Sequence, residues 1–377
     1  MNGSGPAGRP GLAVTPGARG PGGRRLLVIG GGVAGSSVAY FAARAGWTVT
    51  VLDAGSGRAS DVPTALLNPV RGQSGRVDAR ALEGLRLSWS LIRQLSVQGH
   101  QIPHEQRGVL RPLGTDAART RFECHLPTEL PHRWLTATET LSHDWSAHDW
   151  LAPGWPHLLF LPEGGWVSGP ALVAALLAES GATLHRVRAQ TWNAHSATLE
   201  GSEVLTAEAV VWCGGSVGMS WGGASWGGGS GQNGAGTATQ TFTHRGGSLL
   251  LLAQAPAPIP VSAGVYLAPH ETPDGRRGGV LGATFEAPSV QHAASGPPLK
   301  SLHWLLSRAA ALSGDLSATV TGLWTGSRLS GECSGRQSGG WWALTGLGSK
   351  GFLLGPLMAR ELVRELEHPR AETGDGG

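Results

Sequence analysis

The sequence predicts an α/β fold of two domains: a discontinuous domain with a Rossmann-like parallel sheet and a second α+β domain built on an antiparallel sheet. Three observations predict this. A glycine-rich turn joins a short apolar run to a helix-like segment near the start of the chain. Alternating helix and strand patterns return at residues 162–216 and 322–368, whereas residues 240–321 hold strand-like runs separated by turns. The first pattern is typical of a parallel sheet covered by helices, and the second of an antiparallel sheet.

Length and composition agree with a globular chain of two domains. Of the 377 residues, 40% are hydrophobic and 15% are charged, and no window approaches the roughly eighteen apolar residues of a membrane helix. The net charge is +3 and the arginines are scattered, which argues against a nucleic-acid-binding surface. The three cysteines have neither disulfide nor zinc spacing. We therefore expect a cytoplasmic protein without a membrane partner or a bound metal.

Two segments lack the patterns of folded structure. Residues 1–23 are rich in Gly and Pro and lack the apolar run of a secretory signal, so we expect a disordered tail. Residues 217–239 are rich in Gly and Ser, which predicts a flexible insertion. The expected division of the rest gives the first domain residues 24–82, 162–216 and 322–368, and the second domain residues 83–161 and 240–321.

The first domain opens with a βαβ pattern. Residues 26–29 form a short apolar run, residues 36–45 carry the small and apolar residues of a helix packed closely on a sheet, and Gly46 ends that helix. Residues 48–53 alternate β-branched and apolar residues, as a second parallel strand does. A strong amphipathic helix pattern then runs from about residue 78 to 95.

The turn between the first strand and the helix matches the G-x-G-x-x-G fingerprint at Gly30, Gly32 and Gly35. Gly30 allows the tight turn, Gly32 lets a pyrophosphate approach the backbone, and Gly35 lets the helix lie close to the strand. Asp53, at the end of the second strand, would accept hydrogen bonds from ribose hydroxyls. The combination of strand, helix and acid favours dinucleotide binding over a glycine-rich turn that binds no ligand. The motif alone does not distinguish NAD from FAD.

A second glycine turn lies almost three hundred residues later, in "TGLGSKGFLLGP", where Gly346, Gly348 and Gly351 precede another helix pattern. A second group of backbone amides at a helix start suits the flavin end of a long cofactor, because the helix dipole can stabilise negative charge on the reduced ring. No other complete fingerprint is present for a nicotinamide cofactor. An organic substrate is therefore the expected electron donor.

These residues together resemble the FAD-dependent amine and amino-acid oxidases of the D-amino-acid oxidase superfamily. That superfamily includes glycine oxidase, sarcosine oxidase and the flavin domain of a bifunctional tRNA-modifying enzyme. The resemblance runs from about Arg25 to Glu367. It is specific in "VIGGGVAGSSVAYFAARAGWTVTVLDAG" and "LTGLGSKGFLLGP" and looser in "ASDVPTALLNPV", "VVWCGG", "GVYLAPHE", "GGVLGATFE" and "WTGSRLSG". It implies that the first domain binds FAD and that the protein is an FAD-dependent oxidoreductase.

The resemblance also implies roles for individual residues. Arg328 falls where relatives place an arginine that pairs with a substrate carboxylate, and Tyr266 lies on a strand expected to face the substrate. The backbone of Val187 would face the adenine, while Ser60 and Asn68 would line the flavin. The residues expected to contact FAD are Gly30, Gly32, Val33, Ala34, Gly35, Asp53, Ser60, Asn68, Val187, Gly214, Gly346, Gly348, Ser349, Lys350 and Gly351.

The sequence departs from the family pattern in two places. After Arg328 it reads "LSGECSGRQSGG", where many relatives carry Thr, Asp and Pro at fixed spacings, and Leu347 stands where relatives have His. Cys333 lies in this region, but its surroundings do not match those of the cysteines that attach flavin in some relatives. We expect noncovalent FAD.

Three functions follow from the resemblance. The first is oxidation of the carbon–nitrogen bond of a small amine or amino acid bearing a carboxylate, by hydride transfer to flavin N5, with oxygen or another electron acceptor reoxidising the flavin. The second is the same reaction on a carboxymethylaminomethyl group of tRNA uridine, for which Arg328 would serve equally well; the scattered charge disfavours tRNA as a partner. The third is FAD binding without amine oxidase activity.

Overall fold

The computed structural model of the chain describes residues 23–368 except 56, 71, 137–138, 140–149, 222–241, 273 and 287–295. All but the last residue of the expected tail, 1–23, lies outside this part. So does most of the expected insertion, 217–239, whose first five residues belong instead to a short helix, α6 (Ser216–Trp221).

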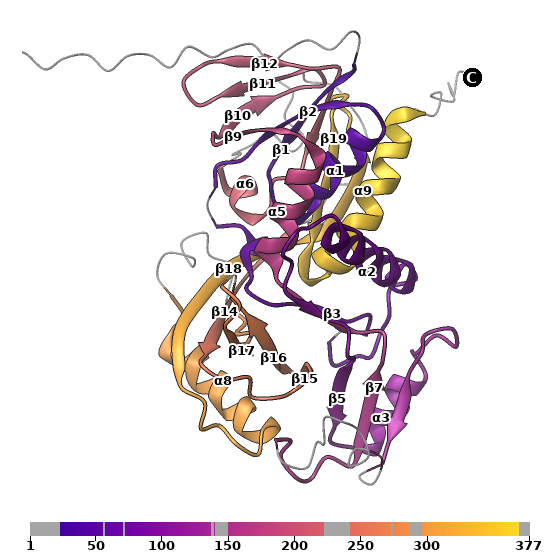
Figure 1. The fold of residues 1–377 in the computed structure, drawn as a ribbon, viewed down its shortest axis with the longest axis vertical. Helices are drawn as coiled ribbons and strands as arrows, with labels where there is room; N and C mark the ends of the chain where they lie inside the picture. The colour runs from indigo at the N-terminus through magenta and orange to yellow at the C-terminus, as the bar shows by residue number, and fades with distance from the viewer. Residues whose placement is uncertain are drawn as a thin grey trace, which may run out of the picture.

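The expected βαβ unit is present at the start of the chain (Figure 1). It consists of β1 (Arg25–Ile29), α1 (Val33–Arg44) and β2 (Thr48–Leu52). Strand β1 pairs in parallel with β2 and with β13 (Ala209–Trp212). The parallel strands continue to β9 (Thr183–His185) beyond β2 and to β19 (Trp342–Leu347) beyond β13. Segments far apart in sequence thus form one parallel sheet, as expected for a discontinuous domain.

Helices cover one face of this sheet and a small antiparallel sheet covers the other (Figure 1). On the helical side, α1, α5 (Gly169–Ser180) and α9 (Gly351–Glu367) share a core with the inward side chains of β1 and β13. On the other side, Leu27 and Ile29 pack against β11 (Ser196–Leu199). The small sheet is completed by β10 (Ala189–Trp192) and β12 (Val204–Thr206).

Helix α2 (Ala81–Val97) differs from the expected division. The boundary at residue 83 assigns nearly all of it to the second domain, yet Leu85, Trp89 and Ile92 lie in the same core as α1 and α9. Its Ser88 hydroxyl donates to the Phe352 carbonyl of α9 at 2.9 Å. The apolar stripe of this helix therefore packs in the half of the molecule that contains the βαβ unit.

The second half of the molecule is the expected antiparallel sheet, drawn in the lower part of Figure 1. Its strands are β14 (Thr243–Leu252), β15 (Val261–Ala263), β16 (Val265–Glu271), β17 (Arg277–Gly282), β5 (Val109–Leu113), β7 (His157–Leu161) and β6 (Arg133–Leu135). Neighbouring strands of this set pair antiparallel except β15 and β5, which pair in parallel. One face packs under α8 (Leu299–Leu312), a helix that the sequence analysis missed.

One long strand joins the two halves. β18 (Val320–Arg336) pairs antiparallel with β14 along its first part and with β19 along its last part, with a register shift between Ser330 and Cys333. A single sheet of thirteen strands therefore runs through both halves. The segment that departs from the family pattern lies in and just after the second part of this strand.

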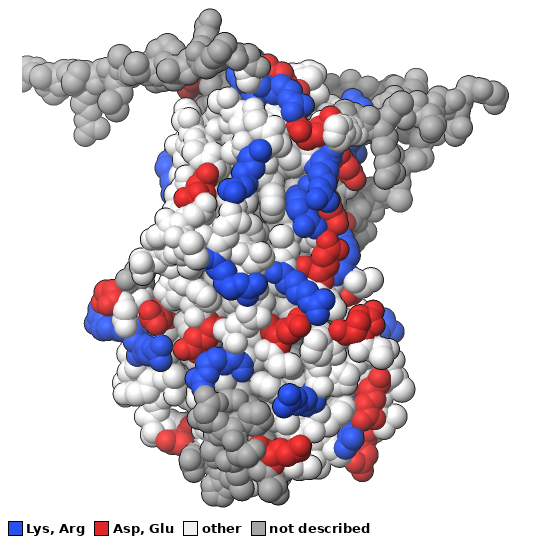
Figure 2. All heavy atoms as spheres, turned by 45° about the vertical axis from the view of Figure 1, so that its right-hand side comes forward, with Lys and Arg blue, Asp and Glu red and all other residues white. Residues whose placement is uncertain are grey.

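The remaining elements connect the two halves. β3 (Ala65–Leu67), β8 (Gly165–Val167) and β4 (His104–Glu105) form a third small sheet, and α3 (Asp116–Glu123) packs beside β5 and β7. Two single turns, η1 (Ala59–Asp61) and η2 (Gly348–Lys350), lie between β2 and β3 and between β19 and α9. No helix within the described residues is long and apolar enough to cross a membrane. On the face drawn in Figure 2, basic and acidic side chains are interspersed.

Candidate cofactor and substrate site

A cavity of about 1050 Å³ extends from the glycine turn after β1 to the antiparallel sheet. It contains most of the residues predicted from the sequence. Those that line it are Gly30, Gly32, Val33, Ala34, Asp53, Ser60, Asn68, Val187, Gly214, Tyr266, Arg328, Gly346, Gly348, Ser349 and Gly351. Gly35 and Lys350 do not line it.

The first glycine turn brings the N-terminus of α1 to the cavity. Gly30 has φ +101°, and a Cβ there would lie 2.8 Å from the carbonyl carbon of Cys213, so only glycine fits. A Cβ on Gly35 would overlap the Gly30 carbonyl oxygen, which explains why this residue lies behind the turn. Gly32 is the N-cap of α1 and supplies no capping side chain. Ser60 accepts from the Val33 amide, so the amides that can meet an anion are those of Ala34 and Gly35, which follow it in the first turn.

Ser60 and Asn68 each bond to the backbone as well as lining the cavity. The Val33 amide donates to Ser60 Oγ at 2.9 Å, and the Val70 amide donates to Asn68 Oδ1 at 3.0 Å. These bonds hold the segment after β2 against the start of α1.

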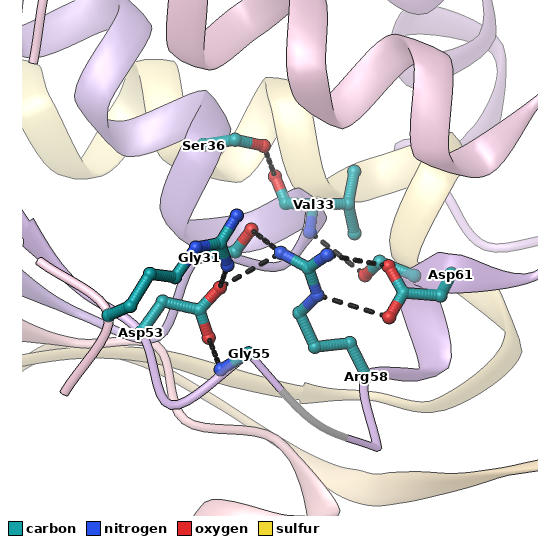
Figure 3. Close-up of polar contacts among 9 residues, drawn as sticks. Gly31, Val33, Ser36, Asp53, Gly55, Arg58 and Asp61 are labelled. Atoms are coloured by element: carbon teal, nitrogen blue, oxygen red, sulfur yellow. Dashed lines mark hydrogen bonds and ion pairs between the residues drawn. The ribbon is translucent and has the colours of Figure 1, made fainter. Parts of the chain in front are cut away.

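Asp53 is only 5% exposed, and two arginines share its carboxylate (Figure 3). Its Oδ2 accepts from Nη1 of Arg58 at 2.9 Å and from Nη1 of Arg186 at 3.1 Å, while Oδ1 accepts from the Gly55 amide at 3.2 Å. Arg58 also pairs with Asp61 at 2.8 Å. Burial alone would lower the pKa of Arg58, but the hydrogen bond and charge of Asp61 and the charge of Asp53 raise it.

Neither Arg58 nor Arg186 was predicted from the sequence as a partner of Asp53. Arg58 lies five residues after the acid within a turn, and Arg186 follows β9, which pairs with β2 only in the folded sheet.

The second glycine turn follows β19 and comes close to the start of α1, because a Cβ on Gly351 would lie 3.2 Å from Val33 Cγ1. Gly346 has φ +73° and a Cβ there would overlap the Gly331 carbonyl oxygen, so the close approach of β18 requires glycine. The Thr345 hydroxyl donates to the Gly214 carbonyl at 3.0 Å, which ties the end of β19 to the end of β13. The turn then enters α9 at Gly351.

Lys350, expected near the flavin, points elsewhere. Its Nζ lies 2.7 Å from Oδ2 of Asp78 and 3.8 Å from Glu332. Although burial opposes it, hydrogen bonds from Arg80 and Lys350 lower the pKa of Asp78. The expectation for Lys350 does not agree with this structure, because the neighbouring carboxylates hold its ammonium outside the cavity.

The substrate side of the cavity is one face of the antiparallel sheet. The alternation of side chains turns Leu110, Val261 and Leu281 into the core under α8 and turns their neighbours toward the cavity. Residues that are paired on adjacent strands have their side chains on the same face of the sheet. The residues that face the cavity are paired in this way from strand to strand, so they form a row across the sheet. The row runs through Arg111, Ser262, Tyr266, Gly282, Leu249 and Trp324, all of which line the cavity except Gly282.

Arg328 lies on the same face, four residues beyond Trp324. Between them the paired Gly247 and Gly326 carry no side chain, and a Cβ on Gly247 would lie 3.6 Å from Nη2 of Arg328. The Arg328 side chain is half-buried and, within the described residues, has no hydrogen bond or ion pair; its guanidinium lies 5.8 Å from the Phe285 ring. The pKa of Arg328 is lowered, mainly by burial and in part by the charge of Arg245, although the charges of Tyr266 and Glu286 oppose this change.

Tyr266 shares this region with Arg328. Its hydroxyl donates to the Thr64 carbonyl at 3.3 Å. Burial raises the pKa of Tyr266, and the charge of Arg328 opposes that change, so the phenol stays protonated at neutral pH.

The cavity is rich in positive charge. Six arginines line it, whereas Asp53 is its only acidic lining residue within the described part of the chain. Five of these six went unnoticed in the sequence because their elements meet only in the fold: Arg58, Arg111, Arg188, Arg245 and Arg308. No group of three or more metal-binding side chains occurs among the described residues. The arrangement fits anionic ligands.

Comparisons with known proteins show the family to which the chain belongs. The family model described as FAD dependent oxidoreductase (DAO) matches residues 25–365. A tRNA 5-methylaminomethyl-2-thiouridine biosynthesis bifunctional protein from Delftia acidovorans is 30% identical over 96% of this chain, and the match spans only 60% of that protein. A protein of the same name from Azoarcus sp. is 34% identical over 45% of this chain and 27% of its own length.

Two solved structures share the fold. Glycine oxidase from Geobacillus kaustophilus superposes with a TM-score of 0.73 and 24% identity, covering 93% of this chain and 96% of that one. Iminodiacetate oxidase from Chelativorans sp. BNC1 gives a TM-score of 0.72 and 21% identity, with coverages of 92% and 96%. With the family match over nearly the whole chain, they identify this protein as a member of the FAD-dependent oxidoreductases of the D-amino-acid oxidase superfamily.

Proposed function

We propose that this protein oxidises the carbon–nitrogen bond of a small amine bearing a carboxylate. The observation that carries the proposal is Arg328: a half-buried guanidinium on the cavity wall, without an ion pair among the described residues, beside the paired Gly247 and Gly326, which carry no side chain. A guanidinium grips a carboxylate through two parallel hydrogen bonds and so fixes the neighbouring carbon in one position. Tyr266 supplies a neutral hydroxyl on the same face.

The cavity residues fit FAD. The open amides of α1 suit the pyrophosphate, Asp53 Oδ1 keeps capacity for a ribose hydroxyl beside its bond from Gly55, and the turn before α9 suits the flavin. Bound FAD would accept a hydride at N5, and the resulting imine would hydrolyse in water. The protein would then position the substrate and exclude side reactions.

We further propose that FAD is held noncovalently in the cytoplasm, with oxygen or another acceptor taking the electrons. Cys333 does not line the cavity, and burial raises the pKa of Cys213, which does, so neither thiol is set up for flavin attachment. The division into an FAD-binding domain (24–82, 162–216, 322–368) and a substrate domain (83–161, 240–321) remains part of this proposal, with α2 packed on the cofactor side.

An anaerobic absorbance titration tests the proposal. Purified protein supplied with FAD is mixed with glycine, sarcosine and a series of D-amino acids, and the visible flavin band is followed. Bleaching by one of these compounds supports the amine oxidase function and identifies the substrate class. A bound flavin that none of them reduces would support FAD binding without amine oxidase activity.

A second candidate is oxidation of a carboxymethylaminomethyl group on tRNA uridine. The names of the curated relatives favour it, and such a group is a secondary amine with a carboxylate that Arg328 would bind equally well. The interspersed charge on the face drawn in Figure 2 argues against it there. Tight tRNA binding that weakens steeply with salt, together with flavin reduction by the modified tRNA, would establish this candidate over the first.

A further inference from the structure

The substrate side of the cavity holds more positive charge than one carboxylate requires. Arg111, Arg245, Arg308 and Arg328 line it, and no acidic residue of the described part lines the same side. None of the four has an ion pair within the described residues. Asp53 lies at the other end of the cavity and already pairs with Arg58 and Arg186.

Arg111 is the most deeply placed of the four. Its side chain is on β5 and is 3% exposed. Nη1 donates to the Val70 carbonyl at 3.1 Å and Nη2 to the Gly72 carbonyl at 2.7 Å, while Nε is buried without a hydrogen-bond partner. The remaining neighbours are Ser262 Oγ at 3.5 Å and the Phe122 ring at 5.3 Å.

This environment favours an anion beside Arg111. Every protein partner of the guanidinium is neutral, and a buried charge without a counter-charge is destabilising. Burial lowers the pKa of Arg111 to about 10, which leaves the side chain charged at neutral pH. An anionic group bound in the cavity beside Arg111 would meet a cation that has no counter-charge among the described residues.

Arg111 is also placed to act on the same molecule as Arg328. Its neighbour Ser262 faces Tyr266 across paired strands. In the order of the sheet, β5, which carries Arg111, and β18, which carries Arg328, lie on opposite sides of β16, the strand of Tyr266. The two arginines therefore border the same cavity on opposite sides of Tyr266.

We propose that the substrate is an amine with two separate carboxylates, one bound by Arg328 and the other by Arg111. This inference rests on the proposed function and adds the substrate class to it. Arg111 is then a specificity-determining residue that distinguishes a dicarboxylate from a monocarboxylate.

Calorimetric titration of the FAD-loaded protein tests the inference without turnover. The probes are thioethers, which cannot be oxidised as amines: methylthioacetate, with one carboxylate, and carboxymethylthio acids with a second carboxylate one to five methylenes from sulfur. At least one dicarboxylate is expected to bind about tenfold or more tightly than methylthioacetate, the scale of a hydrogen bond between charged groups.

Variants of Arg111 separate recognition from support of the loop that contains Val70 and Gly72. Arg111→Met should abolish the preference for the dicarboxylate and leave methylthioacetate binding unchanged, whereas Arg111→Lys should keep part of the preference. Arg86→Gln, on an exposed arginine that pairs with Glu163, is the matched control and should change neither affinity.

Equal binding of all probes by the unaltered protein would overturn the inference, and this arm does not depend on the folding of any variant. An equal loss for both probe types in Arg111→Met would also overturn it, because Arg111 would then only support the loop. If no probe binds and no carboxylate amine reduces the flavin, the proposed function fails as well, whereas flavin reduction without a dicarboxylate preference removes the inference alone.

Discussion

Replacing Gly30 by alanine tests whether the first glycine turn forms the cofactor site. Gly30 has φ +101°, and a Cβ would lie 2.8 Å from the carbonyl carbon and oxygen of Cys213 and 2.9 Å from the Gly214 amide nitrogen. The positive φ costs about 1–2 kcal/mol for alanine, and forcing backbone apart costs about 1–3 kcal/mol more. We expect Gly30→Ala to lower the free energy of unfolding of the FAD-free protein by about 3 kcal/mol.

Two control glycines separate the cost of the positive φ from the cost of the steric contact with the backbone. Gly46 has φ +86° with nothing within 4 Å of an added Cβ, so Gly46→Ala should lose only the conformational part, about 1–2 kcal/mol. Gly355, inside α9, has ordinary contacts at 3.5 Å and beyond, and alanine there should be neutral or stabilising by up to about 1 kcal/mol.

Urea denaturation of the FAD-free proteins measures stability, and quenching of FAD fluorescence measures cofactor affinity. Only Gly30→Ala should weaken FAD binding, by about tenfold or more, because Gly30 lines the cavity and neither Gly46 nor Gly355 does. Equal FAD affinity for the Gly30 and Gly46 variants would refute the assignment of the turn as the pyrophosphate site.

Three further predictions follow from single side chains. Arg328→Lys should lower kcat/KM for a carboxylate amine by about 100-fold while FAD affinity stays unchanged, since lysine cannot form the two parallel bonds; an equal loss for amines without a carboxylate would contradict this role. Asp53→Asn should weaken FAD binding about tenfold in fluorescence titrations, and unchanged affinity would remove the ribose contact. Asp78→Asn should destabilise the protein by about 1 kcal/mol at pH 7, because Arg80 and Lys350 lower the pKa of Asp78 in the folded state. A lowered pKa stabilises the fold above the unfolded value, near 4, and the contribution is lost only as pH falls from there through the lower folded pKa. Urea denaturation should therefore show the difference between the variant and the parent shrinking progressively below pH 4; a constant difference would contradict the ion pair.

The βαβ start of the fold was predictable from the sequence because its signals are local. Apolar runs, a glycine turn and an acid fall within thirty residues. The helix was expected to begin at residue 36 but begins at Val33, and the last glycine of the fingerprint, Gly35, lies in its first turn. The amphipathic pattern of residues 78–95 likewise predicted α2, but its packing partner α9 lies at the far end of the chain.

Other elements were not predictable from local pattern. β18 contains several glycines and little alternation, and it is a strand because β14 and β19 pair with it. Arg328 was identified through family resemblance, whereas Arg111 and Arg245 approach the same cavity only through pairings between distant strands. Lys350 was misplaced because Asp78 is 272 residues away in the chain.

A comparison of two amines that differ only at the group Arg328 would bind tests most directly whether the cavity orients its substrate through a carboxylate. Sarcosine and N-methylethylamine are added anaerobically to the FAD-loaded protein, and the rate of flavin bleaching is measured by stopped flow. If the cavity orients a small amine through its carboxylate, sarcosine should reduce the flavin at least about 100-fold faster at equal concentration. Equal rates, or reduction by neither amine while a modified tRNA reduces the flavin, would contradict the account.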